Sequence, residues 1–272
     1  MMNPYLEQQI SSFISIPTIA NDEKANLAGI EFLQNLLNPL GFETSLEGDS
    51  PYFQPVLVAK YINTNTDKSV VLYGHYDVEK IKDWEHWETP PFELTTKDSR
   101  YFCRGIADNK GVLLMRIFAI KELIDEGEEI PNILWIIQGE EEVGGKTPFQ
   151  VIPIQLSKFK SKLFVEETGV YKNEQPIIFH LPKADEPHQF LVDLNQAIYS
   201  GTAQFANRSL NKFSDCPFLH NIPNDGYYIG FGANDATCRI HKDNESINIH
   251  KLYNHKDIFK KFIKWVYLTQ IS

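Results

Sequence analysis

The sequence predicts an α/β fold, with a largely parallel (mixed) central sheet flanked by helices. Segments with strand-like apolar runs alternate along the chain with segments whose apolar residues recur at helical spacing. This alternation is the pattern that builds a parallel sheet covered by helices. The 272 residues are 42% hydrophobic and 23% charged, so the chain can bury an extensive core as one large domain or two small ones.

Two short amphipathic helices are predicted near the start of the chain. Apolar residues within 6–14 repeat at helical spacing until Pro17, and those within 27–37 repeat until Pro39 and Gly41. Proline ends a helix because it lacks the backbone N–H, and glycine ends one because it tolerates the reversal of the chain. Each helix therefore offers one apolar face for packing.

Strands and further helices follow in alternation. The segment 110–127 has a helical pattern closed by Gly127, whereas 55–62, 69–74 and 132–139 are short apolar runs typical of strands. The remaining elements are expected as strands at 162–165, 176–181 and 227–232 and as helices at 187–201 and from about residue 256.

Composition limits the partners and the compartment. The formal net charge of −10 argues against a broad nucleic-acid-binding surface. No apolar run reaches about 18 residues and the first ten residues lack a basic segment and an apolar one, so neither a membrane span nor a signal peptide is expected. Cys103, Cys216 and Cys238 are odd in number and widely spaced, which favours a reducing compartment. We therefore expect a cytoplasmic protein that binds no nucleic acid and no membrane.

Histidine and acidic residues follow the apolar runs, at the strand ends where ligands bind in such folds. They are His75 and Asp77 in LYGHYDV, Asp108 in RGIADNKG, Glu140, Glu141 and Glu142 in QGEEEVGG, Glu166 and Glu167 in LFVEETG, and His241 in IHKDNESI. Four of the five groups follow a predicted strand, and the aspartate of the second group opens a predicted helix. Imidazole nitrogens and carboxylate oxygens together suit zinc, cobalt or manganese.

The spacing inside two of these groups predicts separate tasks for neighbouring side chains. Residues i and i+2 of an extended strand face the same side, so Asp77 can accept the free ring N–H of His75 and leave the other ring nitrogen for a metal. Adjacent Glu141 and Glu142 point in different directions. One of them can therefore bind a metal while the other reaches a water beside it.

Each group taken alone also has an ordinary explanation. A histidine or aspartate at a strand end is usually solvated, three successive glutamates are usually a charged turn, and His241 lies among charged residues typical of a surface. Five further histidines are expected to be structural or solvated; they are His180, His188, His220, His250 and His255. Five metal-compatible groups in the order of one site nevertheless favour a metal centre.

At these residues the chain resembles the M20 family of metallopeptidases, and within it the dipeptidase branch of carnosinase type. The resemblance lies in VVLYGHYDVEK, WETPPFELTTKDSRYFCRGIADNKG, IIQGEEEVGG and FGANDATCRIHKDNESI, and it runs through most of residues 10–265. It implies a zinc-peptidase-like catalytic domain that binds two divalent metal ions, with zinc expected first and cobalt and manganese as alternatives.

The resemblance also implies roles for single residues. The metal ligands it implies are His75 and His241 as terminal ligands, Asp108 as the carboxylate that bridges both metals, and Glu142 on the second metal. The remaining ligand falls on Glu166, with Glu167 as the one-residue alternative.

Two catalytic assignments come from the same resemblance. Asp77 resembles the carboxylate that orients the metal-binding histidine, and Glu141 resembles the general base. In the family the peptide bond after the bridging aspartate is cis, which here is the bond between Asp108 and Asn109.

The sequence departs from the family in one large feature. Family members carry a lid-like domain that commonly dimerises, but the segment 187–201 already resembles the part of the catalytic domain that follows the lid elsewhere. We expect that the lid, which would fall near 182–187, is absent and that 1–272 forms a single catalytic domain and a monomer. Smaller departures are Cys103, where glycine is usual, and Gly145, where a small hydroxyl residue is common.

Three functions are compatible with this pattern. The leading one is a di-metal peptidase that acts on a dipeptide or on the terminal residue of a small peptide. The second is a deacylase of N-acylated amino acids, and the third is a non-catalytic binding module derived from the peptidase fold. The complete set of expected ligands and base favours an enzyme.

Overall fold

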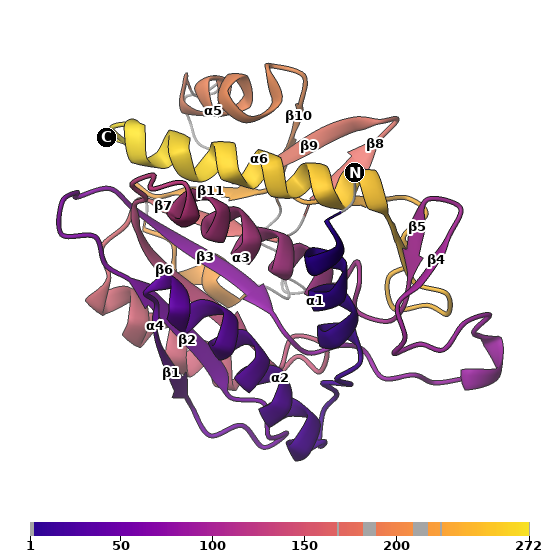
Figure 1. Cartoon of the computed structure of the whole chain (residues 1–272). Coiled ribbons are helices and arrows are strands. Elements are labelled where there is room, and N and C mark those ends of the chain that lie inside the picture. The colour runs from indigo at the N-terminus through magenta and orange to yellow at the C-terminus, as the bar shows by residue number, and fades with distance from the viewer. Residues whose placement is uncertain (1–2, 168, 182–188, 209–216, 224, 272) are drawn as a thin grey trace.

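A ten-stranded mixed sheet runs through the protein (Figure 1). The computed structural model describes residues 3–167, 169–181, 189–208, 217–223 and 225–271. The strand order is β1-β2-β6-β3-β7-β11-β9-β8-β12, with β10 beside β9. The strands are β1 (Glu43–Glu47), β2 (Val56–Tyr61), β3 (Ser69–His75), β6 (Asn132–Gln138), β7 (Leu163–Glu166), β8 (Val170–Lys172), β9 (Gln175–His180), β10 (Gln204–Asn207), β11 (Tyr227–Gly230) and β12 (Asn234–Asp235).

The centre of this sheet is parallel. Strands β6, β3, β7 and β11 pair in parallel, whereas β1 and β2 add antiparallel strands beside β6. In β3 and β6 every residue after the first is buried, which explains their continuous apolar runs, because a parallel strand is covered on both faces. The prediction of a largely parallel mixed sheet is confirmed, and the carboxyl ends of four strands meet at one edge.

Helices cover both faces of the sheet, and most of them lie on one face. The helices are α1 (Pro4–Ile14), α2 (Glu23–Leu37), α3 (Lys110–Asp125), α4 (Thr147–Lys158), α5 (Gln189–Tyr199) and α6 (Ile249–Leu268). Side chains of α1, α2, α3, α5 and α6 share one large apolar core with the sheet, and α3 and α6 lie side by side in Figure 1. On the other face a smaller core holds α4 and the short helix η3 (Pro217–Asn221).

A second, three-stranded sheet joins two distant parts of the chain. It consists of β4 (Thr95–Lys97), β5 (Arg100–Phe102) and β13 (Ser246–Asn248), in the order β13-β5-β4. The antiparallel pairing sets Ser246 opposite Phe102. Strand β5 runs into the segment that carries Asp108, and β13 follows the segment that carries His241. The small sheet therefore brings these two segments together.

The structure differs from the predicted elements at several places. The last helix begins at Ile249, seven residues before the predicted start, because the Asn248 side chain accepts the backbone N–H of Lys251 and caps it there. Helix α4, with Pro153 inside it, and the edge strand β1 were not predicted. Residues 182–188 lie outside the described residues, and with them the expected lid position and the predicted start of the helix at 187–201.

Candidate metal centre

His75 and Asp77 lie where β3 ends, at the carboxyl edge of the sheet. His75 Nδ1 is 3.1 Å from the backbone oxygen of Asp77 and 3.3 Å from its Oδ1. Asp77 Oδ2 accepts the backbone N–H of Glu142 at 3.0 Å, which ties the end of β3 to the segment after β6. Both side chains are 1% exposed. One ring nitrogen of His75 thus faces a carboxylate, and the other faces the centre of the site.

Asp108 lies between the two predicted histidine ligands. Its Oδ1 is 3.0 Å from His75 Nε2, and its Oδ2 is 3.1 Å from His241 Nε2. The bond between Asp108 and Asn109 is cis, as the family resemblance implied. His241 Nε2 is also 2.8 Å from Glu142 Oε2, and donor atoms of His75, Asp108 and Glu142 lie within 4.8 Å of one another. Four predicted ligands therefore converge, with one carboxylate between two imidazoles.

A fully buried carboxylate, that of Glu245, holds the segment before Asp108 in place. Glu245 Oε1 accepts the backbone N–H groups of Ala107 and Asp108 at 2.9 and 3.2 Å, and Oε2 accepts that of Gly105 at 3.0 Å. Arg104 Nη1 donates to Oε2 at 2.8 Å. Since Glu245 follows His241 by four residues, it links the two loops that carry these ligands. Sequence reasoning missed it, because its segment reads as a charged surface loop.

A buried lysine ties the start of α3 to the first helix. Lys110 is 1% exposed, and its ammonium donates to the backbone carbonyl groups of Phe13, at 3.0 Å, and Ile16. It also lies 4.5 Å from the centre of the Phe13 ring, a cation–π distance. The N-terminal end of α3, where Asp108 lies, is thereby fixed to the end of α1.

The three successive glutamates after β6 have different surroundings. Glu140 is buried and accepts the backbone N–H and the hydroxyl of Thr147 at the start of α4. A Cβ on Gly145 would lie 1.9 Å from Glu140 Oε2, so the position where the family often has a hydroxyl residue admits only glycine beside this carboxylate. Glu141 and Glu142 are left at the metal centre.

Glu166 and Glu167 point to different places, and the structure does not bring Glu166 to the other ligands. The Glu166 carboxylate accepts a hydrogen bond from the Tyr228 hydroxyl and is 3.3 Å from Arg208 Nη2. Glu167 Oε2 instead lies 3.9 Å from the position that a Cβ would take on Gly74, next to His75. Glu166 is the last residue of β7 and Glu167 directly follows it. Adjacent side chains of an extended chain face opposite sides, which explains the difference. The structure therefore brings Glu167, the one-residue alternative, next to His75, and it does not bring Glu166 there.

Hydrogen bonds with the carboxylates favour the protonated form of the two histidines. Burial lowers the pKa of His75, but the contacts with Asp108 and Asp77 outweigh it and hold this pKa well above its usual value. The contacts with Asp108 and Glu142 raise the pKa of His241 to about 10. Positive charge on the two imidazoles thus lies where the positive charge of bound metal ions would lie.

Several buried carboxyl groups lie around these histidines. Burial raises the pKa of Glu141 to about 9 and that of Glu142 to about 7, and the charge of Asp108 adds to both. Burial also raises the pKa of Glu167 to about 8. These shifts have a common cause, because several carboxylates share a site that water does not reach well. Divalent cations would offset this charge.

The donor set fits divalent metal ions. Two imidazoles and several carboxylates are hard-to-borderline ligands, and no thiol lies among the described donors. Glu142 Oε1 and Glu167 Oε2 are buried, and no group in the described part of the chain donates a hydrogen bond to them. Buried carboxylate oxygens without donors are costly unless a cation takes them. The residues present therefore suit a metal centre.

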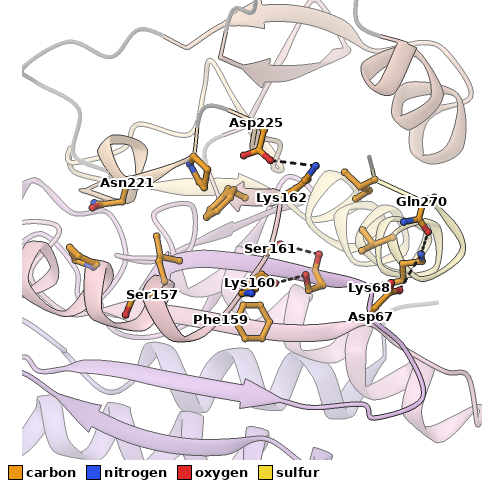
Figure 2. Close-up of a pocket in the computed structure, with 17 residues that line it drawn as sticks. Asp67, Lys68, Ser157, Phe159, Lys160, Ser161, Lys162, Asn221, Asp225 and Gln270 are labelled. Carbon is orange, nitrogen blue, oxygen red and sulfur yellow. Dashed lines mark hydrogen bonds and ion pairs between the residues drawn. The ribbon is translucent and has the colours of Figure 1, made fainter.

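A cavity lies at the end of the sheet opposite to the candidate metal centre. Its volume is about 640 Å³, and Figure 2 shows it between the end of α4 and the C-terminal part of α6. Ser69 and Lys162 line it at the start of β3 and just before β7, and Lys162 Nζ pairs with Asp225 at 3.4 Å. The metal centre is at the other ends of these strands, so this cavity is separate from it.

Two solved peptidases have this architecture. An M20 family metallo-carboxypeptidase, Sso-CP2 from Sulfolobus solfataricus, superimposes with a TM-score of 0.82 and 16% identity, over 98% of this chain and 100% of that chain. Human carnosine dipeptidase 1 gives a TM-score of 0.80 with 13% identity, over 97% of each chain. The chain therefore shares the fold of these two peptidases. The family model of Peptidase family M20/M25/M40 matches residues 71–265, and the chain belongs to this family.

The curated relatives include dipeptidases and a deformylase. Beta-Ala-His dipeptidase of Mus musculus is 32% identical over 143 residues, 52% of this chain and 27% of the relative. Cys-Gly metallodipeptidase dug1 of Schizosaccharomyces pombe is 28% identical over 186 residues, 62% of this chain and 39% of the relative. The chain thus spans less than half the length of these relatives. In the described ranges, no helix combines the length and the apolar character needed to cross a membrane.

Proposed function

We propose that the protein is a metal-dependent hydrolase of peptide bonds, acting on a dipeptide or on the terminal residue of a small peptide. One observation carries this proposal: Asp108 presents one carboxylate oxygen to His75 and the other to His241. A carboxylate with an imidazole on either side can bridge two metal ions, each of which takes one histidine.

Five residues would hold the two metals. They are His75, Asp108, Glu142, His241 and, in place of the predicted Glu166, Glu167. Zinc suits this set of nitrogen and oxygen donors, and cobalt or manganese could replace it. Bound by these residues, two such ions would supply Lewis acidity toward a water and toward the carbonyl of the scissile amide.

The chain supplies the proton transfer and the orientation of its ligands. Glu141 adjoins Glu142 in sequence and lies among the same charged groups. We assign its carboxylate the role of general base, which takes a proton from the attacking water and passes it to the leaving amine. Asp77 holds the ring of His75 through Nδ1, which leaves Nε2 for a metal.

The relatives support a small peptide as substrate and give a second candidate. Two of them are named for the dipeptides Beta-Ala-His and Cys-Gly. A third, N-formyl-4-amino-5-aminomethyl-2-methylpyrimidine deformylase of Halalkalibacterium halodurans, is 29% identical over 144 residues, 51% of this chain and 34% of the relative. It hydrolyses an amide that is not a peptide bond, so removal of an acyl group from an amino acid is the second candidate function.

We further propose that residues 1–272 act as a single catalytic domain, as a cytoplasmic monomer without nucleic-acid or membrane partners. The described strands all belong to the catalytic sheet and the small sheet beside it. Cys103 and Cys238 are buried and free, which supports a reducing compartment.

Metal analysis and parallel assays test the proposed function. The purified protein should bind about two equivalents of zinc, and it should hydrolyse free-amine dipeptides when zinc, cobalt or manganese is added. A higher rate on N-acylated amino acids than on dipeptides would favour the deacylase. Protein that binds no divalent metal and hydrolyses neither class of substrate would be a binding module, and the proposed function would be wrong.

A further inference from the structure

A buried tryptophan lies beside the carboxylate of Glu167. Trp135 belongs to β6, and its side chain is 0% exposed. Its Nε1 lies 4.0 Å from the position that a Cβ would take on Gly74, and Glu167 Oε2 lies 3.9 Å from the same position. Since residue 74 is glycine, it places no side chain at this point. The indole N–H and the carboxylate therefore border one small space next to the end of β3.

Neither of these two groups has a hydrogen-bond partner within the described ranges. Trp135 Nε1 and Glu167 Oε2 are both buried, and both are unpaired there. An indole nitrogen can only donate a hydrogen bond, and an ionised carboxylate oxygen can only accept one. Buried polar groups without partners are costly and rare in native proteins. A free donor next to a free acceptor therefore indicates a contact that the two groups are built to make.

The backbone next to Glu167 is fixed by another side chain. Arg116 Nη2 donates to the backbone oxygen of Glu166 at 2.9 Å and to that of Phe231 at 2.8 Å. The first of these oxygens belongs to the peptide group that joins Glu166 to Glu167. The main chain is therefore held at Glu167, whereas the last torsion of a glutamate side chain is broad. The direction of the Glu167 carboxylate needs a donor of its own.

Arg116 offers a second free donor, but Trp135 is better placed. Arg116 Nη1 is also buried, and no described group accepts a hydrogen bond from it. The planar guanidinium is already bound through Nη2, and through Nε to His255 at 3.3 Å, so it cannot turn to follow the carboxylate. Trp135 Nε1 instead lies near the same point as Glu167 Oε2. The indole is therefore the favoured partner of this carboxylate.

We propose that Trp135 is a positioning residue of the metal centre, whose indole N–H holds the Glu167 carboxylate with an oxygen toward the metal that His75 would bind. The proposal deepens the proposed function and rests on its metal centre. Groups that hydrogen-bond to a metal ligand fix its direction, and their loss typically lowers metal affinity by about 10- to 100-fold. Trp135 contacts neither the metal nor the substrate in this role, so it acts through Glu167 alone.

Zinc affinity, measured by competition with a chelator, tests this role. Trp135→Phe keeps an aromatic ring in the core and removes the N–H, so one of the two zinc equivalents should bind about 10- to 100-fold more weakly. Trp265→Phe removes the same group from α6, where Trp265 packs on Phe190 and Phe262, and it should bind zinc like the wild type. Unchanged affinity in Trp135→Phe would leave the carboxylate to Arg116, and an equal loss in both variants would assign the effect to packing. Either result would overturn the proposal.

The indole signal of Trp135 gives a second test, which needs no metal. Its nitrogen-15 N–H resonance can be assigned in the wild-type protein, so this test does not depend on whether Trp135→Phe folds. In protein without added metal, Glu167→Gln should shift the resonance, because it replaces the carboxylate beside the indole with an amide. Glu166→Gln should leave it in place, since the Glu166 carboxylate contacts Tyr228 instead. An indole resonance that is identical in the wild type and Glu167→Gln would overturn the proposal.

The two measurements separate this proposal from the proposed function. A wild-type protein that bound no zinc would refute the metal centre, and the response of the indole to Glu167→Gln would still decide whether Trp135 holds this carboxylate. A wild-type protein that bound two equivalents of zinc, with an indole that did not respond to Glu167→Gln, would keep the metal centre and refute the positioning role.

Discussion

The carboxylate of Glu245 accepts the backbone N–H of Asp108, with 3.2 Å between Oε1 and the nitrogen. The same carboxylate binds Arg104 in a pair whose members are 1% and 3% exposed. A single buried side chain therefore fixes the position of the residue that lies between the two histidines.

Glu245→Gln should destabilise the fold and weaken metal binding together. The variant leaves Arg104 buried without its counter-charge and turns an amide N–H toward backbone N–H groups. Breaking a buried ion pair on one side costs about 3–5 kcal/mol. Chemical denaturation and zinc titration would measure both effects. Glu174→Gln makes the same substitution on an 84% exposed side chain and should change neither; a similar loss in both variants would contradict this role for Glu245.

Glu141→Gln should abolish most of the turnover but keep the metal. The substitution retains the size of the side chain and removes its ability to accept a proton, and general acid–base catalysis contributes about 10²- to 10⁴-fold. Metal content and kcat measured on the same sample check the prediction. If the variant loses metal in proportion to activity, Glu141 is a ligand rather than the base.

Glu166→Gln and Glu167→Gln should have different effects. Replacement of Glu167 should lower zinc content, because its buried oxygen lies near His75. Replacement of Glu166 should leave zinc in place and lower the free energy of unfolding by about 1–3 kcal/mol, since it weakens the contacts with Tyr228 and Arg208. Elemental analysis and denaturation of both variants would show this, and the opposite pattern would restore Glu166 as the ligand.

His255 should make the fold less stable in mild acid. It is fully buried and accepts a hydrogen bond from Arg116 Nε at 3.3 Å. Burial, with the charge of Arg116 adding to it, holds the pKa of His255 well below its usual value. The folded chain thus leaves this ring neutral, whereas the unfolded chain protonates it below about pH 6.5. Since the unfolded state then binds more protons, stability falls as the pH falls below about 6.5.

A non-titrating variant isolates this contribution. Between about pH 7.5 and about pH 5.5, the free energy of unfolding of the wild-type protein should fall by about 1.4 kcal/mol more than that of His255→Gln. His250→Gln, at an exposed histidine, should behave like the wild type. Identical pH profiles for wild type and His255→Gln would mean that the ring is protonated in the folded protein.

The predictable part of the fold is the part with long apolar patterns. Strands β3 and β6 and helix α3 are continuous buried runs, and their positions follow from the sequence. Strands β4, β5 and β13 have only three residues each, too few for a periodic signal. Helix α4 was not predicted because it contains Pro153, and proline usually ends a helix pattern.

The residues of the site also differ in how well the sequence predicts them. The grouping of His75, Asp108, Glu142 and His241 could be predicted because candidate metal ligands come from few residue types and lie at the ends of elements. The choice between Glu166 and Glu167 depends on which side each side chain faces at the end of β7, and the sequence does not determine that side.

The contact of Lys110 with the end of α1 makes the start of the chain part of the catalytic scaffold. An ammonium group sealed inside the protein relies on two carbonyl oxygens that belong to residues about a hundred positions earlier. Shortening or rerouting the turn after α1 would leave this charge buried without its acceptors, two residues from Asp108. The first sixteen residues thus deserve the same care in protein engineering as the active-site loops, although none of them was predicted to take part in the chemistry.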